Sequence, residues 1–262
     1  INFEKVRSPI RYAGSKLQAL KFIKPLMLDI NYSEYWEPFV GGGALFFAAP
    51  LAKKTVLNDS NKDLINFYQQ IQTSESRNKL IKNVERFNPN KENFTILKNT
   101  IPKNQFEDAC RYFIINRTAY SGIMKNPNWG YDNKKSLQPH KWGERIDIAG
   151  SKLHYAELLN QDFRNFFKRK QSEGVFAFID PPYFHADQKR AYIDHFKFED
   201  HVDLCSILRR AEFKFLLTYD DCSEIRKMYK WAKIKDKSWM YHTANSNMAS
   251  RKKGRELFIT NF

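Results

Sequence analysis

Short runs of uncharged residues that end in a polar or acidic residue recur along the chain. Residues 175–179 are β-branched, aromatic or small and precede Asp180, and residues 55–57 precede Asn58 and Asp59. Runs of this kind are typical of parallel strands that are covered on both faces. Further strands are predicted at 156–163, 213–220 and 255–262. The pattern predicts an α/β fold with acidic side chains at the carboxyl ends of strands, where open sheets bind ligands.

Helical periodicity appears between these runs. Apolar residues spaced by three or four predict a helix over 17–27, with Ser15 as its N-cap and Pro25 as the cause of a kink. Two more helices are predicted over 60–68 and 106–117. Strands that alternate with helices are typical of a parallel sheet with helices on both faces.

The composition changes between residues 72 and 150, where Asn, Lys, Thr and Pro abound and strand-like runs disappear. We interpret 72–150 as an insertion into one larger domain formed by 1–71 and 151–262. A chain of 262 residues is long enough for a domain with such an insertion.

Residues 36–47 read as a strand, a glycine turn at Gly41 to Gly43, and the start of a helix. Glycine lets a ligand approach the backbone closely. A pyrophosphate-binding fingerprint would need a third glycine where Phe46 stands, so a ligand without pyrophosphate fits better. S-adenosylmethionine is one, because the turn and Glu37 could receive its carboxylate and ammonium. The alternative is a glycine hinge between a strand and a helix.

Three other segments offer groups for the same ligand. Tyr12 presents a ring and Lys16 a cation, although both also suit an ordinary capped helix. Asp59 stands where a nucleotide-binding fold supplies an acid to ribose hydroxyls, or it caps the next helix. Asp162 and Phe163 could hydrogen-bond and cover an adenine ring.

The sequence Asp180-Pro181-Pro182-Tyr183 suits a planar amine. Two prolines end the strand and stiffen the backbone, so the Asp180 carboxylate and the Pro181 carbonyl can accept both amino hydrogens while Tyr183 stacks on the ring. The nitrogen lone pair is then free to meet an electrophile. The alternative is a strand that ends in a simple turn.

The charge balance points to a polyanionic partner. Lys and Arg total 44 against 29 acidic residues, which gives a net charge of +15. No long apolar span or basic amphipathic helix supports a membrane role. Three cysteines without a Cys-x-x-Cys pair indicate reduced thiols, and the spacing of His185, His195 and His201 does not predict zinc, so we expect no metal. No signal segment is recognised at the start, and we expect a cytoplasmic protein.

The segment after the 106–117 helix is irregular and interleaves cations with rings, which suits phosphates and bases. A solvated loop is the alternative. The residues expected to bind nucleic acid there are Arg117, Tyr120, Ser121, Lys125, Asn126 and Trp129.

Taken in order, the motifs of residues 12–16, 37–43, 116–122, 162–163 and 180–183 resemble the Dam-type DNA adenine methyltransferases, the D12 class, in the motif order of the alpha group. The resemblance runs nearly end to end. It implies a class I, Rossmann-like methyltransferase fold, with 72–150 as the target-recognition insertion and 1–71 with 151–262 as the catalytic domain. It also implies transfer of the methyl group of S-adenosylmethionine to N6 of a flipped-out adenine in double-stranded DNA, with S-adenosylhomocysteine as product. Under the resemblance Asp180, Pro181 and Tyr183 are catalytic, Arg251 contacts DNA, and the cofactor contacts are Tyr12, Lys16, Glu37, Phe39, Gly41, Gly43, Asp59, Asp162 and Phe163.

The resemblance does not extend to the recognition sequence. Residues 121–124 and 129–134 differ from the segments typical of family members that methylate GATC. The alternatives are a methyltransferase that acts on adenine in RNA or on N4 of cytosine, and a catalytically idle DNA-binding protein on the same scaffold. A cognate restriction endonuclease is a possible partner, and the sequence predicts no oligomeric state.

Overall fold

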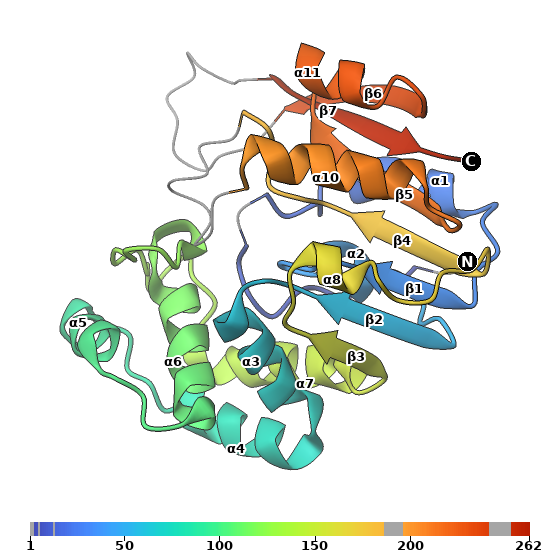
Figure 1. Cartoon of the computed structure of the whole chain (residues 1–262). Coiled ribbons are helices and arrows are strands. Elements are labelled where there is room, and N and C mark those ends of the chain that lie inside the picture. Colours follow the sequence, from blue (N-terminus) through green and yellow to red (C-terminus); the bar gives the residue numbers. More distant parts are fainter. Residues whose placement is uncertain (1–2, 5, 13, 186–195, 241–252) are drawn as a thin grey trace.

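The structure, a computed structural model, describes residues 3–4, 6–12, 14–185, 196–240 and 253–262. Within these residues a seven-stranded sheet carries helices on both faces, and a group of helices lies beside one edge (Figure 1). The α/β class predicted from the sequence is confirmed. None of the described helices is long and apolar enough to cross a lipid bilayer.

The strands and helices alternate along most of the chain. The strands are β1 (Glu34–Glu37), β2 (Lys54–Asn58), β3 (Ala156–Leu159), β4 (Val175–Ile179), β5 (Lys214–Asp220), β6 (Lys233–Met240) and β7 (Lys253–Thr260). The helices are α1 (Leu20–Met27), α2 (Ala44–Ala48), α3 (Lys62–Gln72), α4 (Ser74–Val84), α5 (Lys91–Asn99), α6 (Gln105–Thr118), α7 (Trp142–Leu153), α8 (Phe163–Phe166), α10 (Phe198–Arg209) and α11 (Ser223–Met228). Two short 3-10 turns are η1 (Tyr120–Gly122) and η2 (Pro139–Lys141).

The strand order is β3-β2-β1-β4-β5-β7-β6. The first five strands in this order are parallel, and β7 is antiparallel to both β5 and β6. The chain reverses its direction of winding between β1 and β4, which are neighbours in the sheet. A reversal of this kind opens a crevice at the carboxyl ends of the strands, where ligands of α/β proteins bind.

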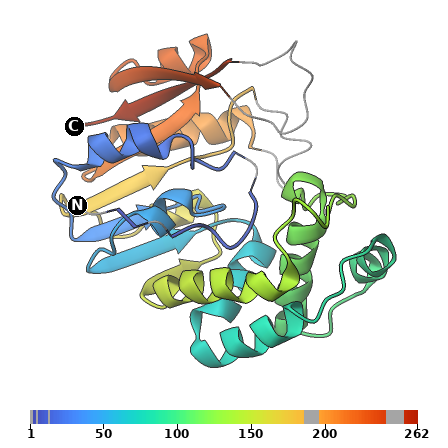
Figure 2. The same cartoon turned by 180° about the vertical axis from the view of Figure 1, so that it is seen from behind.

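The two faces of the sheet are covered by different helices because side chains alternate along each strand. In β4, Phe176 and Phe178 join the core cluster that includes α1, α2 and α3. Ala177 and Ile179 point the other way and join the cluster that includes α8 and α10. Figure 2 shows α1 across the face that lies behind the sheet in Figure 1. An uncharged strand such as β4 therefore sits at the centre of the molecule, as its sequence predicts.

Two local predictions differ from the structure. Helix α1 begins only at Leu20, after Ala19, so Ser15 is not its N-cap. Turns occupy the preceding residues, where the Leu20 amide donates to the Lys16 carbonyl at 3.0 Å. Pro25 does lie inside α1 as predicted. Strand β6 was not predicted, because it is an edge strand rich in Lys, a composition that prevents edge-to-edge pairing and hides the strand pattern.

The helices between residues 72 and 150 pack against α3 and one another beside the β3 edge (Figure 1). Helix α7 continues through residue 150 to Leu153, so the regular structure does not break at the predicted boundary. The Gln72 side chain donates to the carbonyls of Leu153 and Ala156 at 2.8 and 2.6 Å. These bonds join the two ends of the predicted insertion where they meet the sheet.

Candidate active site

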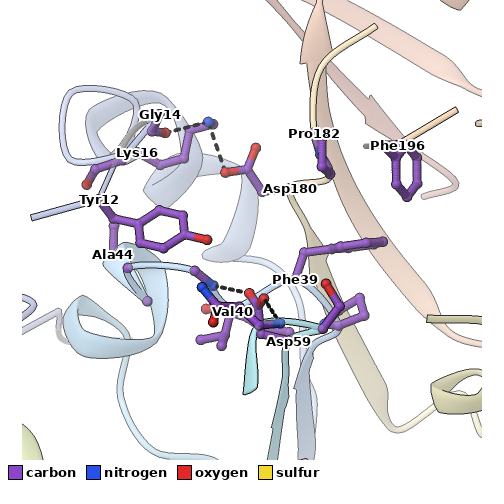
Figure 3. Close-up of a pocket in the computed structure, with 18 of the residues that line it drawn as sticks. Tyr12, Gly14, Lys16, Phe39, Val40, Ala44, Asp59, Asp180, Pro182 and Phe196 are labelled. Carbon is purple, nitrogen blue, oxygen red and sulfur yellow. Dashed lines mark hydrogen bonds and ion pairs between the residues drawn. The ribbon is translucent and has the colours of Figure 1, made fainter. Parts of the chain in front are cut away.

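A cavity of about 310 Å³ opens at the carboxyl ends of β1, β2 and β4. These three strands are neighbours, so the residues that follow them meet at one place. The cavity lining includes every residue that the sequence suggested for cofactor binding, namely Tyr12, Lys16, Glu37, Phe39, Gly41, Gly43, Asp59, Asp162 and Phe163. Asp180 and Lys125 line it as well, so residues suggested for three different tasks share one cavity. Figure 3 shows Tyr12, Asp59 and Asp180 around it.

The glycine turn after β1 is shaped by close contact with Tyr12. Gly41 and Gly43 have φ angles of 46° and 63°, a conformation that other L-residues rarely adopt. A Cβ atom on Gly41 or Gly42 would lie 2.8 Å from carbon atoms of the Tyr12 side chain. Two physical reasons therefore require glycine here, the backbone conformation and the ring that lies against the turn. The result is a bare stretch of backbone at the floor of the cavity.

Asp59 holds this turn in place. Its Oδ2 accepts from the Gly41 amide at 2.9 Å, and its Oδ1 accepts from the Asn61 amide at 3.0 Å. The N-cap of α3 is Asn61, whose side chain accepts from two amides of the first turn, so Asp59 is not the helix cap. The Asp59 side chain is thus fixed in orientation and lines the cavity.

Asn58, which was not suggested as a site residue, ties two loops of the cavity together. Its side-chain amide donates to the carbonyls of Pro38 and Gln161 at 2.9 and 3.0 Å, and its oxygen accepts from the Gln161 amide at 2.9 Å. Asn58 is 1% exposed, so these bonds are shielded from water. An asparagine at the end of a buried strand is the signal that could have pointed to it.

Glu37 is a buried acid at the end of β1. It is 1% exposed, and it accepts a hydrogen bond from the Tyr35 hydroxyl. Burial raises the pKa of Glu37 from 4.5 to about 8, because a charged carboxylate is poorly solvated there, although the Tyr35 bond acts in the opposite direction. Glu37 is therefore largely protonated at neutral pH until a cation reaches it.

Asp180 is engaged by two groups. The Lys16 ammonium lies 2.9 Å from its Oδ2, and the Thr218 hydroxyl donates to its Oδ1 at 2.6 Å. Lys16 is 5% exposed, donates to the Gly14 carbonyl at 2.8 Å, and lies 4.8 Å from the centre of the Tyr183 ring. Figure 3 shows the Lys16 ammonium between Gly14 and Asp180. The Lys16 ammonium, a nitrogen donor, therefore already lies beside the Asp180 carboxylate and over the Tyr183 ring.

The residues that follow Asp180 in the Asp-Pro-Pro-Tyr motif differ in their exposure to the cavity. Pro182 belongs to the lining, whereas Pro181 is buried and Tyr183 packs with the core cluster beneath the site. The Tyr183 and Tyr219 ring centres lie 6.1 Å apart. The sequence suggested a ring that stacks on a base, and here the Tyr183 face is covered by the Lys16 ammonium.

Aromatic side chains form one wall of the cavity. Phe39, Phe163 and Phe196 lie in mutual contact, with ring centres 5.4 to 5.8 Å apart. Asp162 precedes Phe163 and caps α8 by accepting from the Arg164 amide at 2.8 Å. It also forms an ion pair with the Arg164 guanidinium at 3.1 Å. The predicted pairing of an acid with a ring at the cavity edge is present, and Phe196 adds a ring that was not predicted.

The residues suggested for DNA binding lie in different environments. Tyr120 is 55% exposed, and Lys125 lines the cavity. Ser121 and Asn126 have positive φ angles of 53° and 48°, which mark sharp turns of an irregular segment. Trp129 is half-buried against Phe94, at a centre distance of 5.6 Å. Arg251 lies outside the described residues.

Arg117 is buried near the end of α6 rather than exposed to solvent. It is 9% exposed and lies close to Arg11, whose guanidinium donates to the Asn116 and Arg117 carbonyls at 3.2 Å. Burial, and then the charge of Arg11, lower the pKa of Arg117 to about 10. Arg117 therefore reaches a DNA base only if the segment around it moves, whereas Lys125 already faces the cavity.

A parallel sheet extended by an antiparallel strand, with a glycine turn after β1 and Asp-Pro-Pro-Tyr after β4, defines a Rossmann-like methyltransferase. The family model of the D12 class N6 adenine-specific DNA methyltransferases matches residues 12–243, and the chain belongs to this family. It is 30% identical to the Type II methyltransferase M1.LlaDCHI of Lactococcus lactis subsp. cremoris, over 96% of this chain and 94% of that protein.

Two further relatives are similar over most of this chain. The DNA adenine methylase of Vibrio cholerae serotype O1 is 25% identical over 97% of this chain and 95% of that protein. The DNA N-6-adenine-methyltransferase of Escherichia phage P1 is 29% identical over 85% of this chain, which corresponds to 31% of that protein. The family resemblance suggested by the sequence motifs is confirmed.

Proposed function

We propose that this protein transfers the methyl group of S-adenosylmethionine to N6 of an adenine in double-stranded DNA at a specific site. The observation that supports the proposal most strongly is the shared cavity. Its lining includes the glycine turn, Asp59 and Glu37, and also the Asp180 carboxylate. A transfer reaction needs its two reactants in one enclosed space at attack distance, because positioning supplies much of the rate.

The cofactor half of the cavity suits S-adenosylmethionine, which supplies an electrophilic methyl group when bound. Glu37 can take the ammonium of its amino-acid end, because a cation offsets the cost of a charged carboxylate in a buried place. The glycine turn can receive the carboxylate. Asp59 can accept from ribose hydroxyls, since a carboxylate oxygen can accept more than one hydrogen bond. The Phe39 and Phe163 rings suit the adenine.

The acceptor half of the cavity suits an amino group. Asp180 and the Pro181 carbonyl are proposed to accept the two amino hydrogens of a flipped adenine, which leaves its lone pair directed at the methyl group. Tyr183 is proposed to stack on the base and to offset part of the cost of flipping, which is a few kcal/mol. No covalent enzyme intermediate is required, and catalysis rests on positioning and electrostatics.

Lys16 has a different place in this scheme from the one that the sequence suggested. It was a candidate partner for the cofactor carboxylate, yet its ammonium lies on Asp180 and over Tyr183, the two groups proposed for the target base. The incoming adenine must displace it. Glu256, whose Oε1 is 3.9 Å from the ammonium, offers the displaced lysine a second carboxylate.

DNA recognition is proposed for the region between residues 72 and 150. The net charge of +15 suits a polyanion, and Lys125 extends from this region into the cavity. The competing functions are methylation of adenine in RNA, methylation of cytosine at N4, and DNA binding without catalysis. Asp rather than Ser before Pro-Pro-Tyr disfavours cytosine as the substrate. A cognate restriction endonuclease is a proposed partner by analogy with type II systems alone.

The test is expression in a host that lacks adenine methylation, followed by mapping of modified bases by single-molecule sequencing. We expect N6-methyladenine at one short sequence motif, and none with Asp180→Ala as the matched control. Isothermal titration with S-adenosylmethionine distinguishes an idle protein, which would not bind it. Modified cytosine, modified RNA or no modification by a protein that binds the cofactor would each contradict the proposal.

A further inference from the structure

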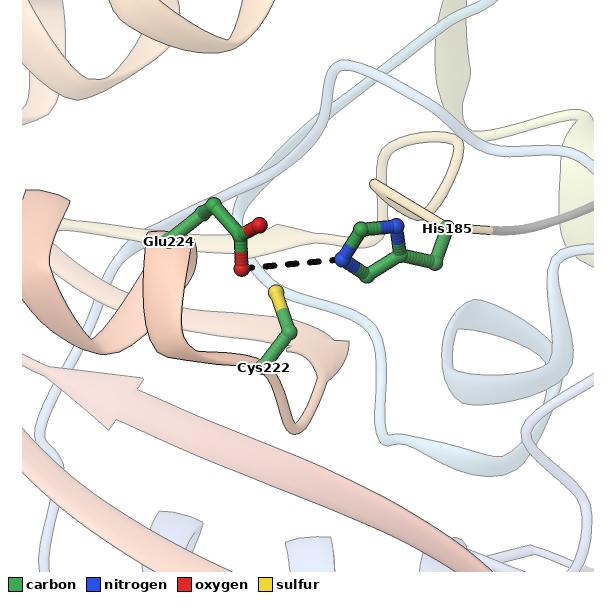
Figure 4. A group of neighbouring side chains, drawn as sticks. All are labelled: His185, Cys222 and Glu224. Atoms are coloured by element: carbon green, nitrogen blue, oxygen red, sulfur yellow. Dashed lines mark ion pairs between the residues drawn. The ribbon is translucent and has the colours of Figure 1, made fainter.

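Three side chains with metal-binding atoms gather beside the catalytic motif. His185 follows Tyr183 by two residues, and Cys222 and Glu224 lie at the start of α11 (Figure 4). One ligand atom of each residue lies within 4.8 Å of the corresponding atom of the other two. The sequence spacing of His185, His195 and His201 did not predict a metal site. The partners of His185 in the structure come instead from a segment about 40 residues away.

We propose that His185, Cys222 and Glu224 form a binding site for a divalent transition-metal cation of the Zn²⁺ class. Imidazole, thiolate and carboxylate are the three protein ligand types that Zn²⁺ takes, and three of them with a water complete a four-coordinate site. Binding displaces the thiol proton of Cys222 and forms the metal–sulfur bond. The proposal does not depend on the proposed methyltransferase reaction.

The spacing of the ligand atoms is close to that of a bound site. With metal–ligand distances of about 2.1 to 2.3 Å, neighbouring ligands of a tetrahedral site lie about 3.4 to 3.6 Å apart. His185 Nε2 and Glu224 Oε2 are already 3.6 Å apart. The other separations, at most 4.8 Å, must contract by about 1 Å, which side-chain rotations can supply because His185 and Glu224 are 59% and 41% exposed.

The surrounding groups favour a cation and hold the backbone in position. The Asp220 carboxylate accepts from the Phe184 and His185 amides at 2.9 and 3.0 Å, so the histidine backbone is already fixed to the end of β5. Burial raises the pKa of Cys222, and a hydrogen bond with the Ile225 backbone acts in the opposite direction. The charges of Asp220 and Glu224 raise the pKa further. The same two carboxylates, which disfavour a thiolate, attract a divalent cation. A bound cation then favours the thiolate form of Cys222.

The ordinary explanation is an ion pair between His185 and Glu224 beside an unrelated cysteine. The Ser223 hydroxyl also donates to Glu224 Oε2 at 2.9 Å, so this carboxylate has partners without a metal. An ion pair requires no role for the sulfur. The contribution of Cys222 therefore separates the two explanations.

The test uses the full chain, treated with a chelator that is then removed, and titrated with Co²⁺ as an optical probe. We expect one equivalent to bind with a sulfur-to-cobalt charge-transfer band in the near ultraviolet and the visible bands of a four-coordinate site. Zn²⁺, measured by competition with a chromophoric chelator, should bind with a Kd below about 1 µM. Cys222→Ser, His185→Ala and Glu224→Gln should each weaken Zn²⁺ binding by at least about 100-fold, more than the loss of an outer-shell partner.

Cys205→Ser and His140→Ala are the matched controls, because they remove a second partly buried cysteine and an exposed histidine elsewhere. Both should bind Zn²⁺ as the unaltered protein does. Melting temperatures without metal show whether each variant folds. In the unaltered protein, Zn²⁺ should also slow amide exchange in the peptide that covers 181–185, and Cys222→Ser should not respond.

Three results would overturn the site. They are a Zn²⁺ Kd above about 100 µM, a Co²⁺ complex without the sulfur band, and unchanged binding in folded Cys222→Ser. If Cys205→Ser or His140→Ala loses binding as strongly as Cys222→Ser, the metal lies elsewhere and the assignment is wrong.

Discussion

Raising the pH through 8 should destabilise the protein because Glu37 must then ionise inside the folded chain. Its pKa is raised by burial from 4.5 to about 8. Between these values the folded protein retains a proton that the unfolded chain has released, so the free energy of unfolding falls as the pH rises. The contribution is fully present below pH 4.5 and is lost above pH 8.

The size of the effect follows from the shift. One pKa unit corresponds to about 1.4 kcal/mol, so the full contribution of Glu37 is about 5 kcal/mol. Between pH 6.5 and 8.5 the loss is about 2 kcal/mol, by the same relation. His201, whose pKa burial lowers to about 4, makes most of its change below this window. The predicted decrease is therefore assigned mainly to one carboxyl group.

Urea denaturation at pH 6.5 and 8.5 measures the decrease, with Glu37→Gln as the control that removes the ionisable group and keeps an acceptor for Tyr35. The unaltered protein should lose about 2 kcal/mol more than the variant between the two pH values. Saturating S-adenosylmethionine should reduce this difference, since an ammonium at Glu37 favours the carboxylate. Equal pH dependence in the two proteins would refute the reasoning.

Five further substitutions test individual residues. Asp180→Ala should leave S-adenosylmethionine affinity within about tenfold and remove methyl transfer, and turnover above about a tenth of the unaltered rate would contradict its catalytic role. Asp59→Ala should weaken cofactor binding by roughly 1.5 to 3 kcal/mol, measured by isothermal titration, and an unchanged affinity would remove Asp59 from the site. Lys125→Ala should relax discrimination at one position of the recognition sequence by about 1 to 3 kcal/mol, measured as methylation rates on single-base site variants, while Arg117→Ala keeps cofactor affinity. If both of these variants lose cofactor binding, or both keep the full specificity, the region does not read the DNA sequence. Lys16→Met should increase 2-aminopurine fluorescence at the target base, because the base no longer competes with an ammonium for Asp180, and equal fluorescence would argue against displacement.

The sequence alone was sufficient for the parallel strands and the residues at their carboxyl ends. The uncharged run of β4 has to be buried on both faces, so its place at the centre of the sheet follows from its composition. The same logic places Glu37, Asp59 and Asp180 at one edge, because parallel strands present their carboxyl ends together. Glycines with positive φ are also a local property, and they marked the turn correctly.

Only the tertiary structure decided which of these groups face one another. Lys16 and Asp180 are separated by 164 positions, and their 2.9 Å contact depends on how the segment before α1 packs beside the end of β4. No periodicity in the sequence reports such a contact. The sequence therefore supplied both residues, and only the structure showed that Lys16 contacts Asp180.

The sequence also did not determine which basic residues are buried and which strand lies at the edge of the sheet. Arg117 is a basic residue in a basic segment, yet it is 9% exposed because Arg11 and the irregular segment pack around the end of α6. Strand β6 carries the polar residues of an edge, so it became recognisable only through its pairing with β7. His185 and Cys222 come together for a similar reason, since adjacent strands β4 and β5 deliver the segments that follow them to one place. Local patterns specify which elements form, whereas contacts between distant segments depend on how those elements pack.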